Sequence, residues 1–265
     1  MVVPHLSPFS HALPSTLPSA RFLMFSWAGK LRYAWRRHGP KGLVWLVVYN
    51  VTYHTLGLIC RVRHQSSVDD FDEEHGTDTD GTRTIASLDV VASPVALYAV
   101  QYQPTGAQLL RDQLDKLNID VAQFTFVDFG SGKGRVLLIA AERPFREVIG
   151  IEFSRELHEI ALRNIGRLPP HLDRRAPVRS VNGDAAEVEL PKGNLVCYFN
   201  NPFGPPIISR VAERLVAHHR DHGCHILVVY VVPRHRDVFE RSGIFRALDE
   251  TQDAVIFTTV PGQAA

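Results

Sequence analysis

One apolar stretch in the C-terminal part of the sequence constrains the fold class of this chain more than any other feature. It reads Ile226-Leu-Val-Val-Tyr-Val-Val232 and has no charged position on either face of a strand. Strands of this kind are buried on both faces, which is typical of parallel sheets covered by helices. Shorter apolar runs at Phe124–Asp128, Glu147–Glu152 and Asn194–Phe199 alternate with helical stretches. We therefore expect a doubly wound α/β fold.

The alternation of strands and helices continues to the C-terminal end of the sequence. Pro177–Val181 is expected to form a strand, and helices are expected near 205–220 and 234–241. Phe245–Asp249 and Ala254–Val260 are predicted to close the sheet as an antiparallel hairpin. Together with the earlier runs, these segments predict a Rossmann-like, mainly parallel sheet of seven strands with an antiparallel terminal hairpin.

Charge separates the N-terminal part of the chain from the rest. Residues 1–67 contain eight Lys or Arg residues and no acid, whereas residues 68–265 contain 21 basic and 28 acidic residues. We expect a disordered leader over 1–20, a basic and apolar helical extension over 21–67, an acidic linker over 68–97 and a folded body over 98–265. Only three cysteines are present, which excludes a disulfide framework and favours a reducing, cytoplasmic location.

An uncharged stretch of 19 residues, Gly42–Cys60, admits three interpretations. A helix here could pack on the body, lie in a membrane interface, or span a membrane. Asn50, His54 and Gly57 would form a narrow polar stripe along such a helix, which disfavours the span. The other two interpretations stay open, and residues 30–60 could bring the protein to an anionic membrane surface as a peripheral protein.

The junction between the extension and the body is strongly acidic. Seven carboxylates occur within the twelve residues 69–80. Their mutual repulsion favours an extended, solvated linker. A calcium loop would need acids at alternating positions and a closing Glu, which this stretch lacks.

A glycine-rich run, Asp-Phe-Gly-Ser-Gly-Lys-Gly-Arg at 128–135, follows a predicted strand and opens a predicted helix. A phosphate-binding P-loop would need a glycine in place of Val127 and a Ser or Thr in place of Gly134. A dinucleotide fingerprint would need a third glycine where Arg135 stands, which weakens that interpretation. The run still suits close backbone approach to a ligand at a helix N-terminus.

Two acids follow the next strands and fit a nucleoside ligand. Glu152 ends its strand 24 residues after Asp128 and could accept both hydroxyls of a ribose. Asp184 follows the third strand and could accept from an adenine amine. Together with the loop they predict a pocket for S-adenosyl-L-methionine (SAM). The candidate cofactor-binding residues are Asp128, Gly130, Ser131, Gly132, Gly134, Glu152, Asp184 and Asn200.

The fourth strand ends in Asn200-Asn-Pro-Phe-Gly-Pro205, at the sheet edge where open α/β sheets bind ligands. An Asn carbonyl can accept a hydrogen from an amine and orient the nitrogen lone pair, and an aromatic ring such as Phe203 can shelter a sulfonium. We take Asn200, Phe203 and Tyr102 as candidate catalytic residues. A strand-ending turn without chemistry is the alternative for this segment.

These segments, with Tyr102-Gln-Pro-Thr105, resemble class I SAM-dependent methyltransferases over about residues 98–232. Within them the chain is most similar to the catalytic domain of histone-lysine methyltransferases that lack a SET domain. The resemblance implies SAM as cofactor, Asn200 beside SAM and the target amine, and a loop at Tyr102 that closes over the cofactor.

The Asn-Asn-Pro-Phe segment departs from that family, being one aromatic and one residue shorter. It is also similar to the Asn-Pro-Pro-aromatic motif of amino-group methyltransferases. Lysine, nucleobase and small-molecule amines therefore stay open as acceptors, and the chain carries no strong nucleic-acid signal. A membrane-tethered SAM-binding regulatory module without turnover and a nicotinamide-dependent oxidoreductase are the alternative functions.

Histidines crowd the segment before the long apolar stretch. This group comprises His218, His219, His222, Cys224 and His225. A metal site is conceivable here. We expect instead that the histidines end a helix, where positive charge suits the helix dipole, and we predict no metal.

Overall fold

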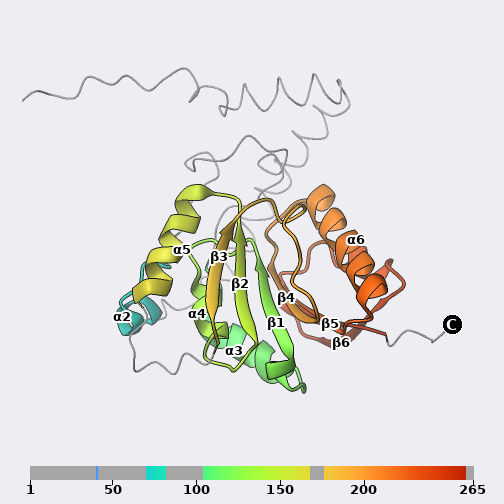
Figure 1. Ribbon diagram of the computed structural model, residues 1–265, viewed down its shortest axis with the longest axis horizontal. Coiled ribbons are helices and arrows are strands. Elements are labelled where there is room, and N and C mark those ends of the chain that lie inside the picture. Colours follow the sequence, from blue (N-terminus) through green and yellow to red (C-terminus); the bar gives the residue numbers. More distant parts are fainter. Residues whose placement is uncertain (1–39, 41–69, 82–103, 168–175, 261–265) are drawn as a thin grey trace, which may run out of the picture. The chain divides into compact units, whose positions relative to one another are not determined.

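The computed structural model describes residues 40, 70–81, 104–167 and 176–260 (Figure 1). The chain divides into two units, Met1–Val62 and Arg63–Ala265, and all described residues except Pro40 belong to the second. The predicted leader, the helical extension apart from Pro40, and Tyr102 lie outside the described residues. Within the described ranges, no helix is long and apolar enough to cross a membrane.

The second unit is built on one sheet of seven strands in the order β3-β2-β1-β4-β5-β7-β6. The strands are β1 (Phe124–Phe129), β2 (Glu147–Glu152), β3 (Val178–Asn182), β4 (Asn194–Asn200), β5 (Ile226–Val231), β6 (Phe245–Glu250) and β7 (Ala254–Thr259). The first five are mutually parallel, while β7 runs antiparallel to both of its neighbours, β5 and β6. This confirms the predicted Rossmann-like sheet with its terminal hairpin.

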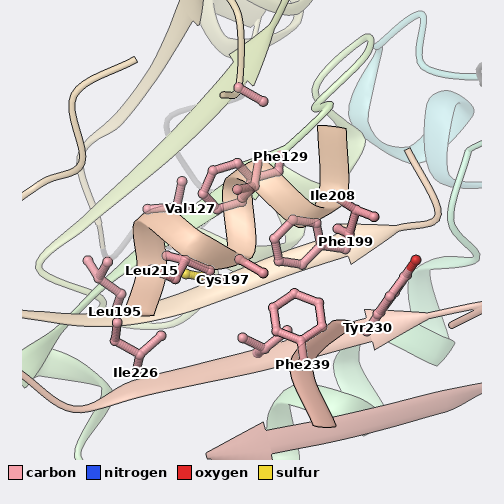
Figure 2. Packing of buried hydrophobic residues seen from close by; sticks show 14 of the residues in the cluster. Val127, Phe129, Leu195, Cys197, Phe199, Ile208, Leu215, Ile226, Tyr230 and Phe239 are labelled. Carbon is pink, nitrogen blue, oxygen red and sulfur yellow. The ribbon is translucent and has the colours of Figure 1, made fainter. Parts of the chain in front are cut away.

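Helices cover both faces of the sheet and create two cores. The longer helices are α3 (Ala107–Asp115), α4 (Arg135–Ala140), α5 (Arg155–Arg167) and α6 (Pro205–His222), and the short ones are α2 (Phe71–His75), α7 (Asp237–Glu240) and the 3-10 helix η4 (Val121–Gln123). Along β5, Ile226, Val228 and Tyr230 enter one core with α6 and α7, while the alternating residues enter the other with α3 and α4. Figure 2 shows the first core, where the rings of Phe129 and Phe199 stack at 4.8 Å.

Strand order places a topological switch point between β1 and β4. From β1 the chain proceeds to β2 and β3 on one side, and later to β4 and β5 on the other. The loops that follow β1 and β4 therefore leave the carboxyl edge of the sheet in opposite directions, and α/β proteins bind ligands at such a point. The two candidate motifs of the sequence follow these two strands.

The acidic segment departs from expectation. Residues 70–81 include the helix α2 and are not an extended, solvated linker, because Phe71 and Thr79 are buried with exposed fractions of 3% and 0%. The cations Lys133 and Arg135 face this segment and offset its negative charge. The prediction of a solvated linker is therefore wrong for Asp70–Gly81.

Candidate active site

The glycine loop turns sharply between β1 and α4. Gly130 and Gly134 have φ angles of 88° and 89°, a conformation that side-chain-bearing residues rarely adopt. A Cβ atom at Gly130 would stand 2.7 Å from the Cβ of Pro202. The loop after β1 therefore touches the Asn-Pro turn after β4, and the two motifs form one site.

Glu152 lies at the carboxyl end of β2 with 3% of its surface exposed. Its Oε2 accepts a hydrogen bond from the Gly132 amide at 2.8 Å, and its Oε1 accepts one from the Ser154 amide at 2.8 Å. The two oxygens of a carboxylate together offer about four lone-pair sites, so Glu152 can accept a further hydrogen bond from a ligand hydroxyl. Burial raises the pKa of Glu152 to about 7, although these backbone hydrogen bonds oppose the rise.

Asp128 is the second buried carboxyl of the site, with 2% exposed. Burial, reinforced by the nearby charge of Glu152, raises the pKa of Asp128 well above its usual value. Both carboxyls lie at the ends of adjacent strands, β1 and β2. A ligand that brings hydroxyl or ammonium donors to this edge would stabilise the ionised forms.

Two buried polar atoms of the site have no hydrogen-bond partner among the described residues. They are Oγ of Ser131, in the glycine loop, and Oδ1 of Asn201, in the turn after β4. Asn201 also has a φ of 43°, an unfavourable conformation of the kind that clusters at functional sites. A buried acceptor or donor without a partner is costly, so both motifs are suited to a polar ligand.

Asn200, at the end of β4, is held in a fixed orientation by Thr105. Its Nδ2 donates to Thr105 Oγ1 at 3.0 Å, and Thr105 Oγ1 is hydrogen-bonded to the Tyr198 hydroxyl at 2.9 Å. Thr105 and Tyr198 are buried, while Asn200 is half-buried. With the amide nitrogen committed to Thr105, the carbonyl oxygen Oδ1 is the end of Asn200 that can accept from an incoming amine.

Tyr198 is a site residue that the sequence interpretation missed. Its hydroxyl is the one polar group of β4 between Asn194 and Asn200 apart from the Cys197 thiol. A buried tyrosine hydroxyl normally finds a hydrogen-bond partner, and this one is fully buried. A tyrosine two residues before the candidate asparagine therefore carried a signal that its hydroxyl supports the site.

For the other candidate residues, the contacts do not test the predicted roles. The Asp184 carboxylate accepts from the Ala186 amide at 2.8 Å and so caps the turn after β3, and its proposed contact with adenine stays a prediction. Phe203 is 2% exposed, and its ring lies 3.7 Å from where a Cβ of Gly130 would stand. Its role at a sulfonium also stays a prediction, as does that of Tyr102.

The crowded histidines lie at the end of α6. His218 and His222 stack with ring centroids 4.5 Å apart, and Nδ1 of His219 is hydrogen-bonded to the Cys224 carbonyl at 2.7 Å. Among the described residues, no group of three or more His, Cys, Asp or Glu side chains could hold a metal ion. The group lies in the C-terminal part of α6 and in its connection to β5.

Comparisons with known proteins give matches in structure and none in sequence. No family model and no curated protein matches the chain. A glycopeptide N-methyltransferase has 14% identity and a TM-score of 0.44, covering 61% of this chain and 92% of its own. A ribosomal protein L11 methylase from Lactobacillus delbrueckii subsp. bulgaricus has 13% identity and a TM-score of 0.42, covering 59% and 78%. The magnesium protoporphyrin IX methyltransferase of Synechocystis PCC 6803, solved with bound SAM, has 13% identity and a TM-score of 0.42, covering 58% and 77%. At these identities the likeness concerns the fold.

Proposed function

We propose that this protein is a SAM-dependent methyltransferase that acts on an amine nitrogen. The observation that carries the proposal is the buried Glu152 carboxylate at the end of β2, hydrogen-bonded to the Gly132 amide of the glycine loop at 2.8 Å. A carboxylate in this position suits a ribose diol, and the loop beside it touches the turn that carries Asn200. The candidate acid for the nucleoside and the candidate amide for the acceptor thus both follow strands at one switch point of the sheet, which supports the proposal.

The described residues fit SAM part by part. Glu152 would hold the ribose hydroxyls, Asp184 the adenine amine, and Asp128 the ammonium end of the cofactor. The unpartnered Ser131 hydroxyl would gain a hydrogen bond that the described protein atoms do not supply. When bound, SAM supplies a methyl group on a positively charged sulfur.

For the transfer itself, the chain has to bind and orient a neutral amine. Asn200 Oδ1 would accept an N–H of the amine and direct its lone pair toward the methyl carbon. The new nitrogen–carbon bond forms as the carbon–sulfur bond breaks, its electron pair goes to sulfur, and the surplus proton leaves nitrogen for solvent. Alignment and exclusion of water supply most of the rate in such a reaction.

The acceptor that we propose is a protein lysine or another amino compound. The lysine assignment rests on the sequence resemblance at Asn200–Pro205. The orientation of the Asn200 amide supports the broader class, because Oδ1 accepts hydrogen bonds and an amine nitrogen carries hydrogens to donate.

Calorimetry with the full-length protein tests the cofactor. We expect S-adenosylhomocysteine and SAM to bind and NAD not to bind. Binding of NAD without SAM would favour the nicotinamide-dependent oxidoreductase. Turnover of radiolabelled SAM on a panel of peptides and small amines then tests the enzyme, since a regulatory module would bind the cofactor and methylate nothing.

The raised pKa of Glu152 predicts a pH dependence of cofactor affinity. The ionised carboxylate accepts hydroxyl hydrogen bonds more strongly than the neutral acid. With a pKa of about 7 in the free protein, affinity for S-adenosylhomocysteine should rise about tenfold from roughly pH 6 to pH 8. Calorimetry at a series of pH values checks this, and the Glu152→Gln variant should show a shallower profile, because only Asp128 then titrates at the site. A slope equal to that of the wild type in this variant would contradict the assignment.

Stability of the unliganded protein should follow the opposite trend. A carboxyl whose pKa is raised by folding binds more protons when folded than when unfolded. The free energy of unfolding should therefore fall as pH rises from 4.5 to about 7 and be level above that range, as far as Glu152 is concerned.

We also propose that residues 30–60 bring the protein to an anionic membrane surface. Each cation near such a surface contributes about 1 kcal/mol of attraction. Full-length protein should sediment with anionic vesicles, and the Arg36→Glu, Arg37→Glu double variant should sediment less. Equal sedimentation of the two proteins, or none by either, would contradict the proposal.

A further inference from the structure

We infer that residues 70–81, here named the strap, position the cofactor loop, and that Lys133 is the positioning residue through which they act. The inference rests on the proposed function, since it concerns how the same loop meets SAM. It is drawn from hydrogen bonds between the strap and the loop, which lie more than fifty residues apart in the sequence.

The strap is folded around the side chain of Asp72. Its Oδ1 accepts from the hydroxyls of Thr77 and Thr79, each at 2.6 Å. Its Oδ2 accepts from the backbone amides of Thr79 at 2.8 Å and Asp80 at 2.7 Å. One carboxylate thereby fixes the turn that follows α2 and gives the strap a defined shape before it meets the loop.

Lys133 inserts into this turn. Its side chain is 3% exposed, and its Nζ donates to Asp78 Oδ1 at 2.7 Å and to the Asp80 carbonyl at 2.6 Å. A buried ammonium is strongly destabilising unless it is paired and hydrogen-bonded, so Lys133 holds the strap and the loop together. The same pairing withdraws this lysine from any ligand phosphate, in agreement with the loop's departure from a P-loop.

Asn164 of α5 joins the strap and the loop a second time. It is fully buried, accepts from the Asp78 amide at 3.0 Å, and donates to the Asp78 carbonyl at 3.0 Å and the Lys133 carbonyl at 2.9 Å. Arg135 adds a contact from the first residue of α4, with its Nε donating to Thr79 Oγ1 at 2.7 Å. The side chains of Lys133 and Arg135, on the two sides of Gly134, are thus hydrogen-bonded to the strap.

Lys133 is linked to the proposed ribose site because its neighbour in the sequence, Gly132, is hydrogen-bonded to Glu152. Gly132, the residue before Lys133, donates its amide hydrogen to Glu152 Oε2. A displacement of Lys133 changes the position of the Gly132 amide and with it the orientation of the Glu152 carboxylate. The strap therefore acts on cofactor binding through Lys133 and Gly132, without contact with the acceptor residue Asn200.

The Lys133→Met variant tests the inference in the full-length protein. Methionine occupies much of the buried volume of the lysine side chain but cannot pair with Asp78, whose side chain is already 60% exposed and can be solvated. We expect the Kd for S-adenosylhomocysteine and the KM for SAM to rise about tenfold, with kcat changed by less than about twofold. Amide hydrogen exchange of residues 130–135 should accelerate without ligand.

Lys116→Met is the matched control. Lys116 forms a Lys–Asp pair of the same 2.7 Å length with Asp249, but on the exposed surface. Its removal should leave affinity and loop exchange unchanged, since a surface pair contributes little. An equal loss of affinity in both variants would show a general destabilisation and overturn the inference.

The Asp78→Asn variant keeps the inference testable if Lys133→Met does not fold. It retains both backbone hydrogen bonds to Asn164 and removes only the charge. We expect Asp78→Asn alone to raise the Kd for S-adenosylhomocysteine. If Lys133→Met folds, the double variant should lose less affinity than the sum of the two single losses. Wild-type affinity in either single variant would overturn the inference about the strap and leave the proposed function standing. If the wild-type protein itself does not bind S-adenosylhomocysteine, both the proposed function and the inference are overturned.

Discussion

The Asn200→Ala variant should lower kcat by about a hundredfold while the affinity for SAM stays close to that of the wild type. Asn200 ends β4, its amide nitrogen donates to Thr105 Oγ1, and its Oδ1 is the amide atom that we propose accepts from the amine. Alanine would leave the amine free to rotate away from the line of transfer. Single-turnover rates with saturating SAM, together with calorimetry on the same variant, measure the two quantities separately.

Thr105→Val is the companion variant. Valine has nearly the shape of threonine but offers no acceptor to the Asn200 amide, so Asn200 would keep its oxygen and lose its orientation. We expect a smaller fall in kcat than for Asn200→Ala, again at nearly unchanged affinity. If Asn200→Ala folds and turns over at the wild-type rate, the Asn-Asn-Pro-Phe segment is a structural turn and the acceptor must be bound elsewhere.

The Glu152→Ala variant should weaken S-adenosylhomocysteine binding by about 1.5–3 kcal/mol, which is the usual loss for hydrogen bonds to a charged group. This corresponds to a rise in Kd of about ten- to 150-fold. The melting temperature should change little, because the variant removes a costly buried charge along with its hydrogen bonds to Gly132 and Ser154. Calorimetry and thermal melting of the unliganded protein check both expectations.

Glu147→Ala is a control on the same strand. Glu147 begins β2, at the opposite edge of the sheet from the site, and pairs with Arg179 at the surface. Its replacement should leave ligand affinity unchanged. Unaltered affinity in Glu152→Ala as well would remove Glu152 from the binding site.

Much of the sheet could be predicted because its signal is local. The apolar run alternates between the two cores over residues 226–231, as a strand buried on both faces must. Strand β2 begins and ends where the sequence pattern places it, at Glu147 and Glu152. Ser154, a residue type that favours helix N-termini, caps α5, its Oγ accepting from the Leu157 amide at 3.3 Å.

The acidic segment could not be predicted from its own composition. Seven carboxylates within twelve residues repel one another in an isolated chain. Their partners, Lys133 and Arg135, lie in the glycine loop, and nothing near residues 70–81 in the sequence announces them. Long-range pairing of charges therefore outweighed the local tendency toward an extended segment.

The motifs of the candidate site could be predicted from the sequence, but the hydrogen bonds through which Thr105 and Tyr198 orient Asn200 could not. Asp128, Glu152 and Asn200 follow from strand ends that can be read in the sequence. The contact of Thr105 with both Tyr198 and Asn200 joins residues more than ninety positions apart, and only the sheet brings them together. Such a contact has no sequence period to reveal it.

The position of β7 has a consequence for how the chain acquires its fold during synthesis on the ribosome. β7 is inserted between β5 and β6, although both precede it in the sequence. Until Ala254–Thr259 has emerged, β5 presents an open backbone edge and β6 has no neighbour in the sheet. Nascent chains of this protein would then expose an apolar strand that invites pairing with other chains, and chaperones would have to shield it until the final strand arrives.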